Sequence, residues 1–445
     1  MLSRLYNPEA FGTLAVFISL ASLLTSVGSW RYELAIPLPA QSTVAANLLV
    51  LCLVVVALMG AVVSLFVLFA AGSIAGWLNC IELAPYLWLL PAAFVGGSAY
   101  QVLGAWALRH EAFEEIARTR VSQSCGMVGT QLALGAAGIG AVGLLAGDVL
   151  GRITGVGVLA RFAWRNFPTD AVSLAGMLAA LRQYVKFPIL SSPASLLTSL
   201  STQLPLLLLV RFFGPAVGGL FVLTTRVLGM PAALLGQAVG QTLLARAARI
   251  KTDEAQVRRL THRTAIGMFA VGVVVFGLVA VGGPGLFAAA FGREWTQAGL
   301  YARMLAPWYL LWLVCNPLSN LLNIREWQST TLLFSALECA VQVAAIMIGA
   351  RLGSQVEAIA LLGAAASVLA LVTMGRFFRA GYTSTFRVFR RMAVPLAGVL
   401  VSLAALLCLL RGPGLAQTAI RIGIFMLICG LLEWRFRVLQ EALKT

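Results

Sequence analysis

Apolar stretches of about 20 residues recur along the whole chain, and each is long enough to cross a bilayer as a helix. No long polar segment separates them. Only 11% of the 445 residues are charged and 60% are hydrophobic, which leaves too little charge to cover a water-soluble domain of this length. We therefore expect an all-α polytopic membrane protein that has no extramembrane catalytic domain and is not an enzyme.

Thirteen of these stretches can be distinguished, and each is expected to form one membrane span. The connection at residues 138–140 is the shortest, so residues 121–160 could instead be one long broken segment. The predicted spans are residues 10–29, 43–70, 84–107, 121–138, 141–160, 188–210, 215–244, 264–290, 300–324, 330–350, 356–375, 392–410 and 417–434.

The basic residues indicate how the chain is oriented. The net charge is +16, and most of the 32 lysine and arginine residues fall in alternate loops. The positive-inside rule places these loops in the cytoplasm, together with the C-terminus, and places residues 1–9 on the outer face. This pattern predicts a multi-pass protein of the inner (cytoplasmic) membrane that meets anionic phospholipids. Because no basic domain exists, no nucleic-acid partner is expected.

The cysteines and histidines do not predict a metal site or a cofactor. Seven cysteines are scattered along the chain without CxxC or Cys/His spacing, and only two histidines are present. Such isolated cysteines are typical of small apolar residues inside spans. We therefore expect neither a metal nor a cofactor, and no disulfide framework.

Two segments of similar sequence indicate an internal repeat. Residues 4–14 and 211–220 align with one gap, and their offset of about 207 residues, six spans, gives both copies the same orientation. Chance similarity of two short turn motifs is the alternative. The aligned pairs are Arg4/Arg211, Tyr6/Phe213, Pro8/Pro215, Gly12/Gly218 and Leu14/Leu220.

The repeat predicts two six-helix lobes. A full span precedes Arg211 but only three residues precede Arg4, so the first lobe is expected to lack its first helix. A late start codon, a trimmed sequence or a genuine five-helix lobe would each explain this. The predicted parts are an N-terminal lobe with five spans (1–165), a cytoplasmic linker (166–187), a C-terminal lobe with six spans (188–375), and two further spans with a cytoplasmic tail (376–445).

Several motifs resemble one family of transporters. Residues 4–12 read RLYNPEAFG, residues 31–39 read RYELAIPLP, and shorter motifs are YVKFP at 184–188, RVLGMP at 226–231 and GQAVGQ at 236–241. Together they resemble the bacterial oligosaccharide flippases (Wzx type, polysaccharide transporter family) of the multidrug/oligosaccharidyl-lipid/polysaccharide (MOP) exporter superfamily. RYELAIPLP is fairly specific, whereas the other motifs are weak alone.

This resemblance implies a fold and an activity. Such proteins have a MATE/MOP-like fold, in which two bundles rock about a central cavity by alternating access. They flip undecaprenyl-pyrophosphate-linked oligosaccharide repeat units from the cytoplasmic to the periplasmic leaflet, for the synthesis of O-antigen, capsule or exopolysaccharide. The implied partners are the lipid-linked glycan, and a glycan polymerase and chain-length proteins.

One intramembrane arginine is the first candidate for contact with a pyrophosphate, because a guanidinium group pairs bidentately with phosphate oxygens. Arg226 lies inside a predicted span, where an isolated charge usually faces a cavity or a partner. At about 100° per residue, Gln237 and Gln241 lie about 20° and 60° from it around the helix. These three residues could form a cavity wall, or a polar clamp between helices.

Arginines near the ends of spans are further candidates. Arg31 and Glu33 flank Tyr32 and could form an entry gate to the cavity, or an interfacial anchor. Arg4 and Arg211 could form an exit-side pair on the outer face, or could extend from helix ends to the headgroups.

Two acidic residues inside spans are candidates for coupling to an H⁺ or Na⁺ gradient. Asp148 and Glu338 are these residues, and Arg152 lies four positions after Asp148, so the two could pair on one helix face. Each acid could equally be a satisfied structural group.

Two other functions fit the pattern of spans. A MATE-type drug or cation exporter would share the topology, but it would favour acids over an arginine such as Arg226 in its cavity. A membrane glycan polymerase or glycosyltransferase usually needs a long outer loop, whereas the predicted outer loops are all short.

Overall fold

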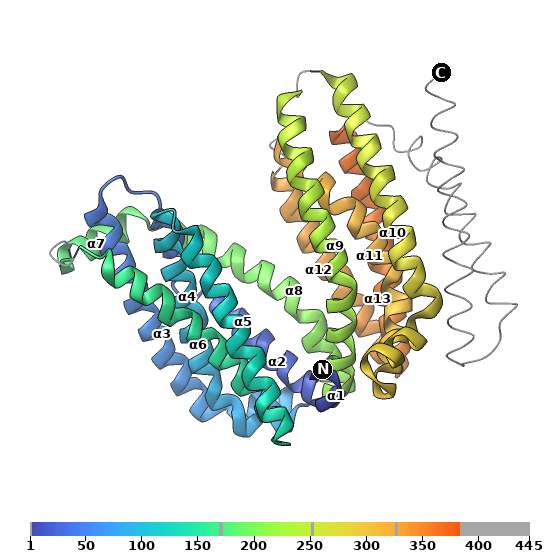
Figure 1. Ribbon diagram of the computed structural model, residues 1–445, viewed down its shortest axis with the longest axis horizontal. Helices are drawn as coiled ribbons and strands as arrows, with labels where there is room; N and C mark the ends of the chain where they lie inside the picture. Colours follow the sequence, from blue (N-terminus) through green and yellow to red (C-terminus); the bar gives the residue numbers. More distant parts are fainter. Residues whose placement is uncertain (1, 169–171, 251–252, 325–327, 383–445) are drawn as a thin grey trace, which may run out of the picture. The chain divides into compact units, whose positions relative to one another are not determined.

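The computed structural model describes residues 2–168, 172–250, 253–324 and 328–382, and most of these residues lie in helices (Figure 1). No strand occurs in these ranges. The chain divides into two compact units, Met1–Gly219 and Leu220–Thr445. Each unit is described by itself below.

The first unit is built mainly from seven longer helices joined by short turns and short helices. In chain order, its elements are α1 (Leu2–Leu5), α2 (Pro8–Thr25), η1 (Tyr32–Ala35), α3 (Ser42–Trp77), η2 (Ile81–Leu89), α4 (Leu90–Arg109), α5 (Phe113–Ala136), α6 (Ala141–Arg165), α7 (Leu174–Gln183), η4 (Phe187–Ser191) and α8 (Ser192–Phe213).

The second unit begins within α9, whose first turn belongs to the first unit. Its core packs α10 against α11 and α11 against α13, while α12 lies on α13. The elements are α9 (Pro215–Arg249), α10 (Glu254–Phe291), η5 (Arg293–Trp295), α11 (Thr296–Ile324), α12 (Gln328–Leu352) and α13 (Gln355–Ala380).

Eleven of the thirteen predicted spans correspond to helices, and the other two (392–410 and 417–434) lie outside the described residues together with the predicted tail. In the described part of the chain, nine helical segments are long and apolar enough to cross a membrane. They do not include α5 and α12, which form at two of the predicted positions. The chain is therefore a multi-pass membrane protein.

The predicted break near residue 139 is confirmed, because α5 and α6 are separate helices that pack closely along each other. Gly138 and Gly140 have φ values of 73° and 64°, a conformation that costs glycine little and other residues much more. Residues 121–160 are therefore not one broken span.

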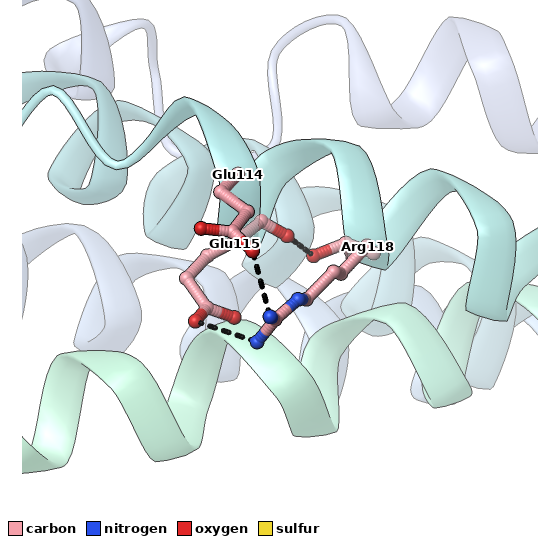
Figure 2. A network of polar contacts seen from close by, with 4 residues as sticks. Glu114, Glu115 and Arg118 are labelled. Carbon is pink, nitrogen blue, oxygen red and sulfur yellow. Dashed lines mark hydrogen bonds and ion pairs between the residues drawn. The ribbon is translucent and has the colours of Figure 1, made fainter.

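Helix α5 begins at Phe113, eight residues before the predicted span 121–138. Glu114 and Glu115 lie in its first turn, where the helix dipole favours negative charge. Arg118 pairs with both, at 2.7 Å to Glu114 and 3.4 Å to Glu115 (Figure 2). Such exposed pairs contribute only about 0.3–0.5 kcal/mol each. They help to begin the helix and do not constitute a site.

The two repeated segments contact each other through a reciprocal pair of glycines. A Cβ at Gly12 in α2 would overlap the carbonyl oxygen of Pro215, and a Cβ at Gly219 in α9 would overlap the carbonyl oxygen of Pro8. Both segments therefore have the spacing Pro-x3-Gly. The contact aligns them without a gap, so Gly219, and not Gly218, is the counterpart of Gly12.

The end of α8 also belongs to the first unit, where α8 packs on α2. The observed division after Gly219 thus comes later in the chain than the predicted linker at 166–187. The assignment of helices to two repeated lobes stays a prediction.

Candidate substrate cavity

A cavity of about 570 Å³ lies within the first unit, among helices α2, α4, α5, α6 and α8. Most of the residues that line it have polar or charged side chains. The charged lining residues are Arg31, Asp148 and Arg152, and the others are Ser22, Thr25, Ser26, Gly97, Tyr100, Gln101, Gln123, Ser124, Met127, Gly151, Ser195 and Ser199.

The wall formed by α6 depends on three glycines spaced four residues apart. Gly147, Gly151 and Gly155 lie against α5, where an added Cβ would meet Gln131, Met127 and Gln123 respectively. Small residues at this spacing let membrane helices approach closely. The next stripe around α6 carries Asp148 and Arg152, which consequently face the cavity beside α5.

Asp148 and Arg152 form an ion pair within this wall. Arg152 Nε donates a hydrogen bond of 2.7 Å to Asp148 Oδ2. The side chain of Arg152 is 21% exposed, and that of Asp148 is 8% exposed. The predicted pairing on one helix face is therefore present, while the proposed role of Asp148 in ion coupling stays a prediction.

Arg152 also lies against α4 and near Thr25 of α2. A Cβ added at Gly97 would lie 3.2 Å from Arg152 Nη1 and 3.2 Å from Thr25 Oγ1. Gly97 thus leaves the space in which the guanidinium group lies. Since Nε is engaged by Asp148, the Nη atoms are the ones placed toward this space.

Arg31 enters the cavity from the turn that follows α2. Its Nη1 lies 3.2 Å from Oε1 of Glu33, and the other carboxylate oxygen of Glu33 accepts a hydrogen bond from Ser29 Oγ. Glu33 is buried and does not line the cavity. The Nε of Arg31 is buried and has no hydrogen-bond partner among the described residues. The ion pair with buried Glu33 therefore fixes the position of Arg31. Of the predicted pair, only Arg31 lines the cavity.

The backbone at this turn adopts an uncommon conformation. Trp30 and Arg31 have φ values of 50° and 62°, in the left-handed region that non-glycine residues rarely adopt. Such conformations cost of order 1–3 kcal/mol each and need support from the surrounding structure. Tyr32 supplies support, because it is buried and its hydroxyl group donates a hydrogen bond of 3.2 Å to the carbonyl oxygen of Leu181.

The predicted trio on α9 lies in the second unit. Arg226, Gln237 and Gln241 are all exposed, and α9 is one continuous helix across them. Exposed Met230 and Leu234 lie on the same face. The three polar residues thus share an exposed face as predicted, but they do not line the cavity of the first unit. Their contact with substrate stays a prediction.

The remaining candidates are dispersed. Arg4 is exposed in α1, and Arg211 is half-buried in the last turn of α8; neither forms an ion pair with another described residue. Glu338 is half-buried in α12, where its Oε1 lies 3.3 Å from Gln342 Nε2. Asp148 and Glu338 belong to different units.

Arg152 and the two cavity glutamines, Gln101 and Gln123, were not among the predicted substrate contacts. The pattern of small residues at 147, 151 and 155, next to an Asp and an Arg four apart, could have indicated Arg152. Among the described residues, no group of three or more His, Cys, Asp or Glu side chains is placed to hold a metal ion.

Comparison with known proteins gives a family and a fold. A family model described as "Polysaccharide biosynthesis protein" matches residues 1–299. No curated protein sequence matches the chain. The fold is similar to that of the lipid II flippase MurJ in an inward closed conformation, with a TM-score of 0.73, 11% sequence identity, and coverage of 97% of this chain and 93% of that one.

A second similar structure is an inward-facing multidrug resistance MATE family transporter of the MOP superfamily. Here the TM-score is 0.65 and the sequence identity 16%, with coverage of 85% of this chain and 92% of that one. At these identities the likeness establishes the fold alone. The predicted MATE/MOP-like fold is therefore confirmed.

Proposed function

Because this chain belongs to the family of polysaccharide biosynthesis proteins, we propose that it is a flippase for lipid-linked oligosaccharides. In this proposal it moves undecaprenyl-pyrophosphate-linked repeat units from the cytoplasmic to the periplasmic leaflet of the bacterial inner membrane. The repeat units would serve the synthesis of O-antigen, capsule or exopolysaccharide. The family and the MOP-type fold support a flippase or transporter in general.

The observation that carries the proposal is the composition of the cavity. A glycan cannot enter hydrocarbon, because each unpaired polar group costs several kcal/mol there. The cavity offers serine and threonine hydroxyl groups together with the amides of Gln101 and Gln123. These groups can replace the water that sugar hydroxyl groups lose. The polyprenyl chain, being apolar, can remain in the bilayer.

Two cations in the cavity suit a pyrophosphate. Arg31 and Arg152 both line it, whereas Asp148 is the acid in the lining and Glu33 is buried behind Arg31. Guanidinium groups form charge-assisted hydrogen bonds to phosphate oxygens, and the Nη atoms of Arg152 remain available for them. We assign Arg31 and Arg152 to the pyrophosphate and the neutral polar residues to the sugars.

Asp148 is the proposed point of coupling to an H⁺ or Na⁺ gradient. Its carboxylate forms an ion pair with Arg152 through one hydrogen bond of 2.7 Å. Protonation of Asp148, or its engagement by Na⁺, would release Arg152 toward the substrate. Arg226, Gln237 and Gln241 remain candidates for further substrate contacts on α9.

A MATE-type exporter of cationic drugs is the second candidate, because the fold is shared with such a transporter. The two arginines of the cavity disfavour it, since they would repel a cation. A glycan polymerase or glycosyltransferase has less support, because the connections between the described helices are short.

A clean deletion in a strain without paralogues tests the proposal. We expect surface glycan to be lost and lipid-linked repeat units to accumulate on the cytoplasmic side. The wild-type gene and the Arg118→Ala variant should restore export, because Arg118 pairs with Glu114 and Glu115 at the surface and does not line the cavity. Arg152→Ala should reach the membrane without restoring export. Normal surface glycan combined with increased sensitivity to cationic drugs would support the exporter instead.

A further inference from the structure

Helix α7 presents an uncovered apolar face at one end of the first unit. Leu174, Leu178 and Leu181 are 70%, 50% and 37% exposed. Their spacing of four and three residues places them in one stripe along the helix. Three leucines together on an exposed face indicate a surface that contacts a membrane or another molecule, because contact of apolar side chains with water is unfavourable.

The opposite face of α7 is fixed against the unit. Ala180 is buried, and the backbone of Gly176 lies against the side chain of Asn47, near the start of α3. Asn47 Oδ1 accepts a hydrogen bond of 3.0 Å from the amide of Ser173, the residue that caps α7. Since these contacts set the rotation of the helix, the leucine stripe is held facing outward.

Basic residues lie on α7 and at the end of the preceding helix. Arg182 and Lys186 are exposed on and just after α7, and Arg161 and Arg165 are exposed at the end of α6. Ala163 of α6 and Ala180 of α7 belong to the same hydrophobic cluster. In the sequence, Asp170 is the only acidic residue between Asp148 and Asp253.

The chain also places α7 close to the membrane. One candidate span ends at Arg165, and the next begins at Phe187, with three residues between it and the end of α7. This short tether keeps the helix at the level where the spans leave the bilayer. Trp164, which is 83% exposed, is of the residue type enriched at that level.

We propose that α7 is an anionic-phospholipid binding element, which lies on the bilayer surface with Leu174, Leu178 and Leu181 inserted at the boundary of the acyl chains. The surrounding arginines and Lys186 bind the phosphate groups of the lipids. Amphipathic helices with a basic border bind membranes in this way. The occupant is a lipid surface and not a protein, because the short tether to the next span leaves α7 at the bilayer. This surface is separate from the cavity.

Two matched spin labels test the position of the helix in the full-length protein. Leu178→Cys and Ala179→Cys are introduced after the native cysteines are replaced, and both variants are reconstituted in nanodiscs of phosphatidylcholine with one quarter phosphatidylglycerol. Because Ala179 is exposed on a different side of α7, it is the control. We expect the label at 178 to be more accessible to oxygen than to a water-soluble nickel complex, and the label at 179 to show the reverse. Equal access of the nickel complex to both labels would overturn the proposal.

The charge requirement is tested separately in the same discs. Replacing phosphatidylglycerol by phosphatidylcholine, or combining Arg182→Gln with Lys186→Gln, should lower the oxygen-to-nickel accessibility ratio at 178 at least twofold. The ratio at 179 should not change, which shows that the protein remains folded. An unchanged ratio at 178 in both experiments would overturn the assignment of anionic lipid.

Discussion

Arg152 donates its Nε hydrogen to Asp148 at 2.7 Å across one turn of α6, in the wall of the cavity. Removing Arg152 alone leaves a carboxylate that is 8% exposed without its cation. We expect Arg152→Ala to lower the free energy of unfolding by about 3 kcal/mol, because an uncompensated buried charge is costly. The double variant Asp148→Ala/Arg152→Ala should lose clearly less. Thermal unfolding in detergent measures both, and equal losses would argue against the pair.

Gly97 leaves room for that guanidinium group. Gly97→Ala puts a methyl group 3.2 Å from Arg152 Nη1 and from Thr25 Oγ1, so the arginine has to move. We expect binding of undecaprenyl pyrophosphate to weaken roughly fivefold, which corresponds to about 1 kcal/mol. Gly104→Ala, on the same helix, is the control, because its Cβ would meet nothing within 4 Å. Equal affinities of the two variants for this lipid would show that Gly97 does not shape the site.

The reciprocal glycine contact should be sensitive to a single methyl group. Gly12→Ala or Gly219→Ala drives a Cβ into a backbone carbonyl group, which cannot rotate away. Overpacking of this kind costs about 1–3 kcal/mol. The double variant should cost less than the sum, since one substitution already separates the segments. Gly72→Ala in α3, whose Cβ would lie in open space, should leave the midpoint of thermal unfolding unchanged or raise it.

The start of α10 should depend on pH. Hydrogen bonds from the amide and then the side chain of Gln256 hold the pKa of Asp253 below its usual 3.8. A carboxyl group whose pKa is lowered on folding stabilises the fold above its unfolded pKa, and this stabilisation is lost as the pH falls through the folded value.

Hydrogen exchange at the first turn of α10 measures this effect. Relative to intrinsic rates, protection at Gln256 should decrease as the pH falls below 3.8 and through the lowered pKa of Asp253. Gly176 at the start of α7 is the control, because its amide bonds to the hydroxyl group of Ser173, which does not titrate in this range. A parallel loss of protection at both helix starts would indicate general unfolding and contradict the prediction.

The helices were largely predictable, because a 20-residue apolar stretch in a membrane has few alternatives to a helix. The start of α5 was not predicted, because it lies eight residues before the apolar stretch 121–138. Glu114 and Glu115 lie in this first turn, where negative charge is favourable and Arg118 is near enough to pair. The Pro-x3-Gly register was also missed by one residue, because a sequence alignment cannot show which glycine makes the close contact.

The cavity was predictable only in part. The spacing of Asp148 and Arg152 indicated their pairing, since residues four apart are neighbours on any helix. That Arg31 shares their cavity depends on how the turn after α2 packs beside α4 and α6, which local sequence does not determine. The α9 trio shows the same limit, because periodicity places Arg226, Gln237 and Gln241 on one face but does not show what that face contacts.

Transfer between leaflets is the most direct test of the proposed flippase. Purified protein is reconstituted into liposomes that contain a fluorescent undecaprenyl-pyrophosphate-linked oligosaccharide, and a membrane-impermeant reagent reports the fraction of glycan in the outer leaflet. We predict that the wild-type protein and Arg118→Ala expose the glycan of the inner leaflet, whereas Arg152→Ala performs like protein-free liposomes. If the wild-type protein leaves the distribution unchanged, with and without an imposed H⁺ or Na⁺ gradient, the account is contradicted.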